Sequence, residues 1–160
     1  MDKTLLVTGG TGSFGNAVVK KFLKSNTFSE IRILSRDENK QDRMSKDYNN
    51  NKLSFFLGDV RDKERVKSVC KGVDVIFHAA ALKQVPSCEN ATWETIKTNI
   101  FGSKNVIEAA ISNKVKNLTL LSTDKSVYPI NTMGMTKGLM EKMALSVDFP
   151  DKTNINCVRY

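Results

Sequence analysis

Three glycines near the start of the chain have the spacing of a phosphate-binding turn. Gly9, Gly12 and Gly15 stand three residues apart, after the apolar run 5–7 and before a stretch with helical periodicity. Gly9 permits a tight turn, Gly12 lets a diphosphate approach the backbone, and Gly15 allows the following helix to pack closely. The positive end of that helix would face the phosphates. We therefore predict a dinucleotide site here; the alternative is a plain glycine-rich turn. Its predicted residues are Gly9, Thr11, Gly12, Ser13, Phe14 and Gly15.

A second group of residues has the chemistry of proton transfer. Ser122, Thr123, Asp124 and Lys125 follow an apolar run, and Lys137 lies one turn inside a later helical pattern. A lysine beside a carboxylate and a bound cationic ring has reason to shift its pKa, which suits acid–base work. The alternative is that Asp124 and Lys125 are an exposed pair in a turn.

The elements that must position these groups alternate along the chain. Strands are predicted at Thr4–Thr8, Glu30–Ser35, Leu53–Leu57, Val73–Ala79, Leu118–Ser122 and Ile155–Val158. Helices are predicted at Ser13–Ser25, Glu38–Tyr48, Lys63–Cys70, Trp93–Asn113 and Thr132–Val147. Such alternation predicts an α/β fold, a doubly wound parallel sheet of the Rossmann type with six strands in the order 3-2-1-4-5-6. At 160 residues, one domain covering 1–160 is expected.

The end of the second predicted strand is where such a fold reads an adenosine ribose. Ser35 and Arg36 stand there, about 20 residues past the glycine turn, where a lone carboxylate would favour a free 2′-hydroxyl. A hydroxyl and a guanidinium suit a 2′-phosphate, so NADP is favoured over NAD, which stays possible. Alternatively, Arg36 is a surface charge, and Asp37 caps the next helix with either coenzyme.

The third and fourth strand ends supply further candidates. Asp59 and Val60 could frame the adenine, whereas Asp62 is as well explained as a helix cap. The small residues at 79–81, Ala79, Ala80 and Ala81, would let the coenzyme lie against the backbone. His78 could be a catalytic base, but a packed histidine is favoured. Lys83 begins a stretch, 83–87, that is expected to be a loop at the crevice.

The amino-acid composition argues against several classes of protein. Hydrophobic content of 40% and charged content of 26% are typical of a soluble globular protein, and no apolar run approaches the ~20 residues of a membrane span. Three widely spaced cysteines and one histidine predict no disulfide framework and no metal site. With no signal peptide recognised, a cytoplasmic location is expected. The net charge of +8 comes from dispersed lysines, so nucleic acid is not the expected partner.

The combined motifs resemble those of the extended short-chain dehydrogenase/reductases. Within them the chain is most similar to the bacterial UDP-N-acetylglucosamine 4,6-dehydratases that invert carbon 5, in the branch serving capsule and O-antigen polysaccharide. The motifs are T-G-G-T-G-S-F-G, S-R-D-E-N-K-Q, G-D-V-R-D, H-A-A-A-L-K-Q-V-P, K-T-N-I-F-G, L-S-T-D-K and V-R-Y. The resemblance implies a lyase that uses NADP, a UDP-sugar substrate, and a homo-oligomer for the longer family members.

The same resemblance implies roles for individual residues. Thr123 would polarise the sugar 4-oxygen, and Asp124 with Lys125 would form the acid–base pair for elimination and reprotonation. Lys137 would hold the nicotinamide ribose, and Asn99 would support the lysine through water. Lys83 would lie near the substrate.

Two features depart from the family pattern. Met133 stands four residues before Lys137, where a tyrosine is usual, and a thioether cannot take a proton. Family members are also considerably longer, with a small domain that grips the nucleotide-sugar. We therefore expect a fragment with the coenzyme half and little activity alone. A 4-epimerase or reductase, or a non-catalytic dinucleotide-binding module, are the alternatives.

Overall fold

Six parallel strands form one sheet in the computed structural model, which describes residues 3–146 and 153–160. The order is β3-β2-β1-β4-β5-β6, which confirms the predicted α/β topology. The strands are β1 (Thr4–Thr8), β2 (Glu30–Ser35), β3 (Leu53–Leu57), β4 (Val75–His78), β5 (Asn117–Leu121) and β6 (Asn154–Val158). The helices are α1 (Ser13–Ser25), α2 (Glu38–Tyr48), α3 (Lys63–Val69), α4 (Val85–Asn90), α5 (Thr92–Ile96), α6 (Ser103–Ser112) and α7 (Thr132–Leu145).

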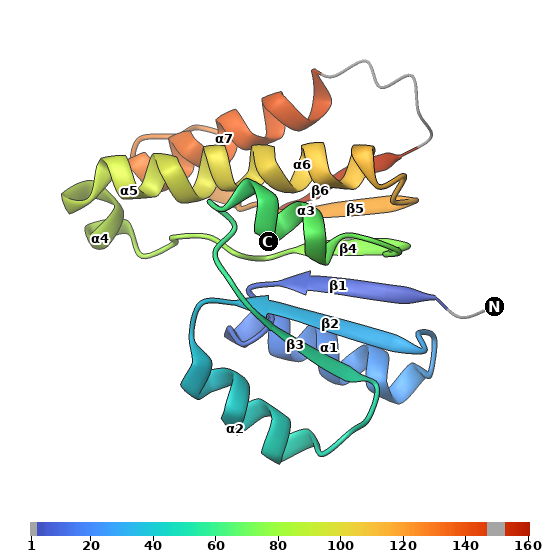
Figure 1. The fold of residues 1–160 in the computed structure, drawn as a ribbon. Helices are drawn as coiled ribbons and strands as arrows, with labels where there is room; N and C mark the ends of the chain where they lie inside the picture. The colour runs from blue at the N-terminus through green and yellow to red at the C-terminus, as the bar shows by residue number, and fades with distance from the viewer. Residues whose placement is uncertain (1–2, 147–152) are drawn as a thin grey trace.

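Alternate residues of the central strands face two separate hydrophobic layers. Leu5 and Val7 of β1 pack in one cluster with Val19 of α1 and Met44 of α2, so these helices cover one face of the sheet (Figure 1). Leu6 belongs to a second cluster, to which α3, α6 and α7 contribute. Because strand side chains alternate between faces, the apolar centre of β1, Leu5–Val7, is buried on both sides of the sheet.

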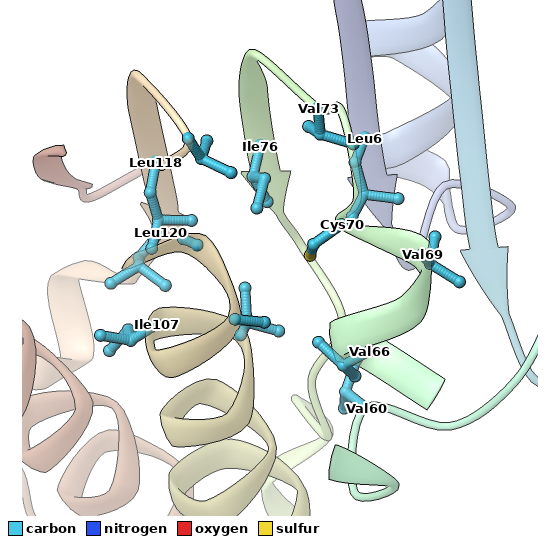
Figure 2. Close-up of a cluster of buried hydrophobic side chains, with 14 of the residues drawn as sticks. Leu6, Val60, Val66, Val69, Cys70, Val73, Ile76, Ile107, Leu118 and Leu120 are labelled. Carbon is cyan, nitrogen blue, oxygen red and sulfur yellow. The ribbon is translucent and has the colours of Figure 1, made fainter. Parts of the chain in front are cut away.

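The second cluster holds the half of the sheet that carries the later strands. Figure 2 shows Leu6, Ile76 and Leu118 from three adjacent strands gathered with Val66 of α3 and Ile107 of α6. These five side chains are 3% exposed or less. Each is worth about 1.5–3 kcal/mol in transfer free energy when buried. This packing fixes the strand ends at which the candidate residues lie.

Two predicted helix starts are capped as the sequence indicates. Asp37 accepts a hydrogen bond from the backbone N–H of Lys40 at 3.0 Å and begins α2. Asp62 accepts from the N–H of Arg65 at 2.9 Å and begins α3. The capping interpretation is therefore confirmed for both residues.

The long helix predicted at Trp93–Asn113 is interrupted. After α5 the chain makes a π-helical stretch, Lys97–Gly102, before α6 begins at Ser103. Gly102 meets Val60 there, and a Cβ on this glycine would lie 2.7 Å from Val60 Cγ2. A π-helix keeps the chain helical while changing which side chains face the sheet, so a 3.6-residue period does not reveal it.

The expected crevice loop at 83–87 is wrong in part. Helix α4 begins at Val85, and only Lys83 and Gln84 precede it. Pro86 sits in the first turn, where its missing N–H has no helical partner to lose. The predicted end of the last helix, Val147, lies outside the described residues. Across 3–146 and 153–160, none of the helices combines the length and apolarity needed to cross a bilayer.

Candidate functional site

A cavity of about 1160 Å³ opens at the carboxyl ends of the strands. Residues from the ends of β1 to β5 line it, together with Tyr160 just beyond β6. It therefore lies where ligands bind in doubly wound sheets. Seventeen of the predicted residues line it: Gly9, Thr11, Gly12, Ser13, Phe14, Gly15, Ser35, Arg36, Asp59, Val60, Ala79, Ala80, Ala81, Lys83, Thr123, Lys125 and Lys137.

The glycine turn is shaped by close backbone contacts. Gly9 has a φ of +67°, and a Cβ there would lie 2.8 Å from the backbone of Ala80. A Cβ on Gly15 would lie 2.5 Å from the carbonyl oxygen of Gly9. Gly12 differs, because its φ of −75° and ψ of 167° suit any residue, and its Cβ would meet only Gly9 O, at 3.2 Å. The space above Gly12 is thus left open toward the cavity.

That space faces the start of α1. Gly12 is the N-cap of the helix and offers no side chain to the first-turn N–H groups. These groups and the positive end of the helix dipole suit an anion. A turn that a Cβ would fill, beside an N-terminus without a side-chain cap, fits the diphosphate of a dinucleotide.

The end of β2 and the first turn of α2 bring two basic side chains to one wall of the cavity. Arg36 Nη1 lies 3.5 Å from Asp59 Oδ2, and Lys40 Nζ lies 3.3 Å from Asp37 Oδ2. Lys40 lines the cavity and was missed, although it stands within the motif S-R-D-E-N-K-Q. It faces the site because it lies in the first turn of α2.

Asp59 is held as a carboxylate between two arginines. Partial burial pushes its pKa up, but the hydrogen bonds from Arg61 and the charges of Arg61 and Arg36 outweigh that effect. Its pKa is therefore below the ordinary value. Arg61 Nε donates to Asp59 Oδ2 at 2.9 Å, so Arg36 is the second, weaker partner and can turn toward a ligand.

The residues Thr123, Asp124 and Lys125 form a compact turn at the end of β5. Thr123 Oγ1 donates to Asp124 Oδ1 at 3.0 Å, and Lys125 Nζ donates to the same oxygen at 3.2 Å. These two bonds hold the pKa of Asp124 below its usual value. Asp124 itself does not line the cavity and its side chain is 73% exposed. The exposed-pair interpretation thus describes Asp124, whereas Lys125 also faces the cavity.

Lys137 is the one lysine of the predicted set that is buried. Its Nζ donates to the carbonyl oxygen of Leu121 at 2.7 Å and lies 3.7 Å from Met140 Sδ. Burial lowers the pKa of this amine to about 8, against the raising effects of Cys157 and Glu141. Met133, one turn earlier, also lines the cavity and is 5% exposed. The position of the usual tyrosine therefore carries no proton acceptor.

Thr98 is a lining residue that the sequence reasoning missed. Its side chain is 97% buried, yet Oγ1 finds no hydrogen-bond partner among residues 3–146 and 153–160. Thr95 and Thr136, also in helices, donate to the carbonyl four residues back at 3.0 and 2.8 Å. Thr98 lies in the π-helical stretch. A buried hydroxyl without a partner at a cavity wall fits a site that receives a polar ligand.

Asn99, the neighbour of Thr98, lies outside the lining. Its amide donates to the carbonyl oxygen of Leu82 and to Thr136 Oγ1, and it accepts from the N–H of Leu82. These contacts tie the segment after β4 to α7. Asn99 can therefore act on the site only through its neighbours.

His78 is fully buried and is also outside the lining. Ser103 Oγ donates to the carbonyl of Asn99, so it accepts from His78 Nε2–H at 2.9 Å, and Nδ1 accepts from Thr8 Oγ1 at 2.7 Å. Burial, with the charge of Lys137, lowers its pKa to about 3. The packed-histidine interpretation is confirmed. No three His, Cys, Asp or Glu side chains gather into a metal site within the described part of the chain.

Comparisons with known proteins point to one family. A family model described as "Polysaccharide biosynthesis protein" matches residues 5–160. A UDP-glucose 4-epimerase from Rickettsia prowazekii (strain Madrid E) is 54% identical over 166 residues, covering 100% of this chain and 49% of the relative. The chain spans about half the length of the curated relatives it matches.

Solved structures share the fold, and this chain again covers about half of each of them. The X-ray structure of Pen from Bacillus thuringiensis superposes with a TM-score of 0.96 at 34% identity, over 99% of this chain and 50% of that one. The dTDP-glucose 4,6-dehydratase DesIV from Streptomyces venezuelae, with NAD and TYD bound, gives 0.89 at 22% identity, over 98% and 55%. The latter likeness concerns the fold alone.

Proposed function

This chain belongs to the polysaccharide biosynthesis protein family, and on that premise we propose that it is the coenzyme-binding part of an enzyme acting on a nucleotide-linked sugar. One observation carries the proposal. One cavity has the open glycine turn in one wall, and Thr123, Lys125 and Lys137 in another. A dinucleotide bound along it would bring its reactive end to the acid–base residues. Residues 1–160 would then be one Rossmann domain, and a UDP-sugar its partner.

The proposed coenzyme is NADP. Ser35, Arg36 and Lys40 supply a hydroxyl and two cations at the wall where an adenosine 2′-phosphate would sit, beside the start of α2. The glycine turn would hold the diphosphate, and Asp59 with Val60 would frame the adenine. The coenzyme could lie close to the backbone at the small residues Ala79, Ala80 and Ala81. NAD is the alternative, because structures of similar fold are solved with it.

At the other end, a bound nicotinamide coenzyme would supply hydride chemistry at sugar carbon 4. Thr123 would polarise the 4-oxygen. Lys137, whose pKa of about 8 lets it hold or release a proton near neutral pH, would contact the ribose. Because Met133 cannot take the 4-hydroxyl proton, the proposed acceptor of that proton is another group of the site or water.

The proposed overall reaction is that of a UDP-N-acetylglucosamine 4,6-dehydratase, a lyase serving surface polysaccharide such as capsule. Loss of water across carbons 5 and 6 needs an acid and a base side by side, and Asp124 with Lys125 supplies both. Lys83, on the cavity wall, would contact the substrate. The proposal places this work in the cytoplasm and in a homo-oligomer of the longer protein.

A UDP-sugar 4-epimerase is the second candidate. It is favoured by the 54% identical relatives that carry the name UDP-glucose 4-epimerase. Both reactions begin with oxidation at carbon 4, so they share the coenzyme site. They differ in product, because only the dehydratase forms a 4-keto-6-deoxy sugar. Product analysis with a longer relative and UDP-N-acetylglucosamine separates them.

The coenzyme proposal is tested on the chain itself. NADP should raise its melting temperature, and Arg36→Ala should reduce that rise more for NADP than for NAD. Arg43→Ala is the matched control, because Arg43 is exposed on α2, the helix that follows Arg36, and lies outside the cavity. No rise with either coenzyme would refute the proposal. An equal loss for both would refute the preference for NADP.

A further inference from the structure

Glu141 is a buried carboxylate that the proposed reaction does not use. It stands one turn after Lys137 on α7, its side chain is 8% exposed, and it is not part of the cavity lining. Burying a carboxylate is costly unless it is paired and hydrogen-bonded. Its partners therefore indicate what the charge is for.

Those partners come from both sides of the reactive turn. Ser122, at the end of β5, donates to Glu141 Oε1. Ser126 Oγ, three residues beyond Thr123, lies 2.8 Å from the same oxygen and 2.6 Å from the carbonyl oxygen of Thr123. One carboxylate oxygen thus ties down the residues that flank Thr123, Asp124 and Lys125.

Both oxygens of Glu141 also bind the segment after β6. Arg159 donates from Nε to Oε1 at 2.9 Å and from Nη2 to Oε2 at 2.5 Å, a two-pronged pair. The next residue, Tyr160, lines the cavity, and its ring lies 5.5 Å from that of Phe14. The hydrogen bond from Arg159, helped by those from the two serines, lowers the pKa of Glu141 to about 2 against the raising effect of burial. The carboxylate is therefore charged at every pH near neutrality.

We propose that Glu141 is a positioning residue, which sets the Thr123–Lys125 turn and the Arg159–Tyr160 segment on two sides of the reactive end of the cavity. Lys137, on the same helix, also restricts the end of β5, because its Nζ donates to the carbonyl oxygen of Leu121 at 2.7 Å. Charge-assisted bonds from one carboxylate to three segments restrict all of them together. This inference deepens the proposed function and rests on it.

Because the cavity has two ends, an effect of Glu141 on ligand binding at one end can be distinguished from a general loss of stability. Glu141 acts at the nicotinamide end, whereas Arg36 and Lys40 lie at the adenosine end. Glu141→Gln keeps the shape of the side chain but turns an amide toward Arg159 and removes the charge. We expect it to weaken binding of NADPH about tenfold and to leave binding of adenosine 2′,5′-bisphosphate within about twofold. Titration calorimetry well below the melting temperature measures both affinities for the whole chain.

Two further variants distinguish positioning from a plain stabilising ion pair. Glu30→Gln is the matched control, because Glu30 pairs with Arg32 at 3.0 Å at the opposite end of the strands and lies outside the cavity. It should lower stability without changing either affinity. The double variant Glu141→Met with Arg159→Met replaces the pair by apolar side chains of similar length, which often preserves stability. It should recover the melting temperature of wild type but keep the weak NADPH binding.

Each outcome of these measurements supports or overturns the positioning role of Glu141. If Glu141→Gln binds NADPH as tightly as wild type, or loses both ligands equally, Glu141 does not position the reactive end. Recovery of NADPH affinity in the Met–Met variant overturns the inference as well. If wild type binds neither ligand, the proposed function fails and the inference fails with it. Wild-type binding of both ligands together with an unaffected Glu141→Gln variant overturns the inference alone.

Discussion

Replacing Gly12 by alanine separates ligand approach from folding in the glycine turn. The backbone at Gly12 has φ −75° and ψ 167°, which alanine adopts without strain, and the added Cβ would meet only Gly9 O, at 3.2 Å. We expect the unliganded Gly12→Ala chain to keep its stability to within about 1 kcal/mol. The methyl group would, however, occupy the space proposed for the diphosphate.

The expected loss can be worked through as a melting experiment. At NADP equal to 100 times its dissociation constant, wild type gains about 2.7 kcal/mol of stability. For a domain of this size that corresponds to a rise of about 5–10 °C. A hundredfold weaker affinity leaves about 0.4 kcal/mol, or less than about 2 °C. Differential scanning fluorimetry with and without NADP measures both.

Two other glycines serve as comparisons. Gly138→Ala, on α7 and outside the cavity, meets only Ser126, at 3.4 Å or more, and should leave the NADP shift intact. In Gly15→Ala the Cβ would lie 2.5 Å from Gly9 O and 2.6 Å from Gly10 Cα, so the fold itself should lose about 1–3 kcal/mol or more. A full NADP shift in Gly12→Ala would refute the diphosphate assignment.

Three other outcomes are expected. The single histidine, His78, is buried between Thr8 and Ser103, so nitrogen-15 NMR should show no titration of its ring between pH 5 and 8. The same spectra should show the ring proton on Nε2. A titration midpoint near pH 6.5 would contradict the structure. The buried amine of Lys137 has a pKa of about 8, below its unfolded value, so wild-type stability should gain from this group as pH rises from about 8 to 10.5. Urea unfolding of Lys137→Met should lack that gain, and an unchanged profile would argue against the burial. Asp37→Ala should lower the midpoint of urea unfolding, because it removes the hydrogen bond from Lys40 N–H, and an unchanged midpoint would show that the cap contributes nothing.

The order of elements and the glycine turn could be predicted because their signals are local. Apolar runs such as Leu5–Val7, alternating with helical periodicity, already specify a doubly wound sheet. Asp37 and Asp62 show as caps because a cap needs only a side chain at the right offset from the helix start. A parallel sheet also gathers its strand ends on one edge, so most of the predicted residues meet in one cavity.

Tertiary structure decided what depends on contacts between distant residues. The π-helical turn that places Thr98 at the cavity while Asn99 binds Leu82 arises where Gly102 meets Val60, and no short-range pattern encodes it. The interpretation of His78 was settled only by its burial. Glu141 reads in the sequence as an ordinary helical carboxylate, and its pairing with Arg159 appears only once α7 and β6 lie side by side. Local periodicity specifies elements, whereas burial and long-range hydrogen bonds determine which side chains can act.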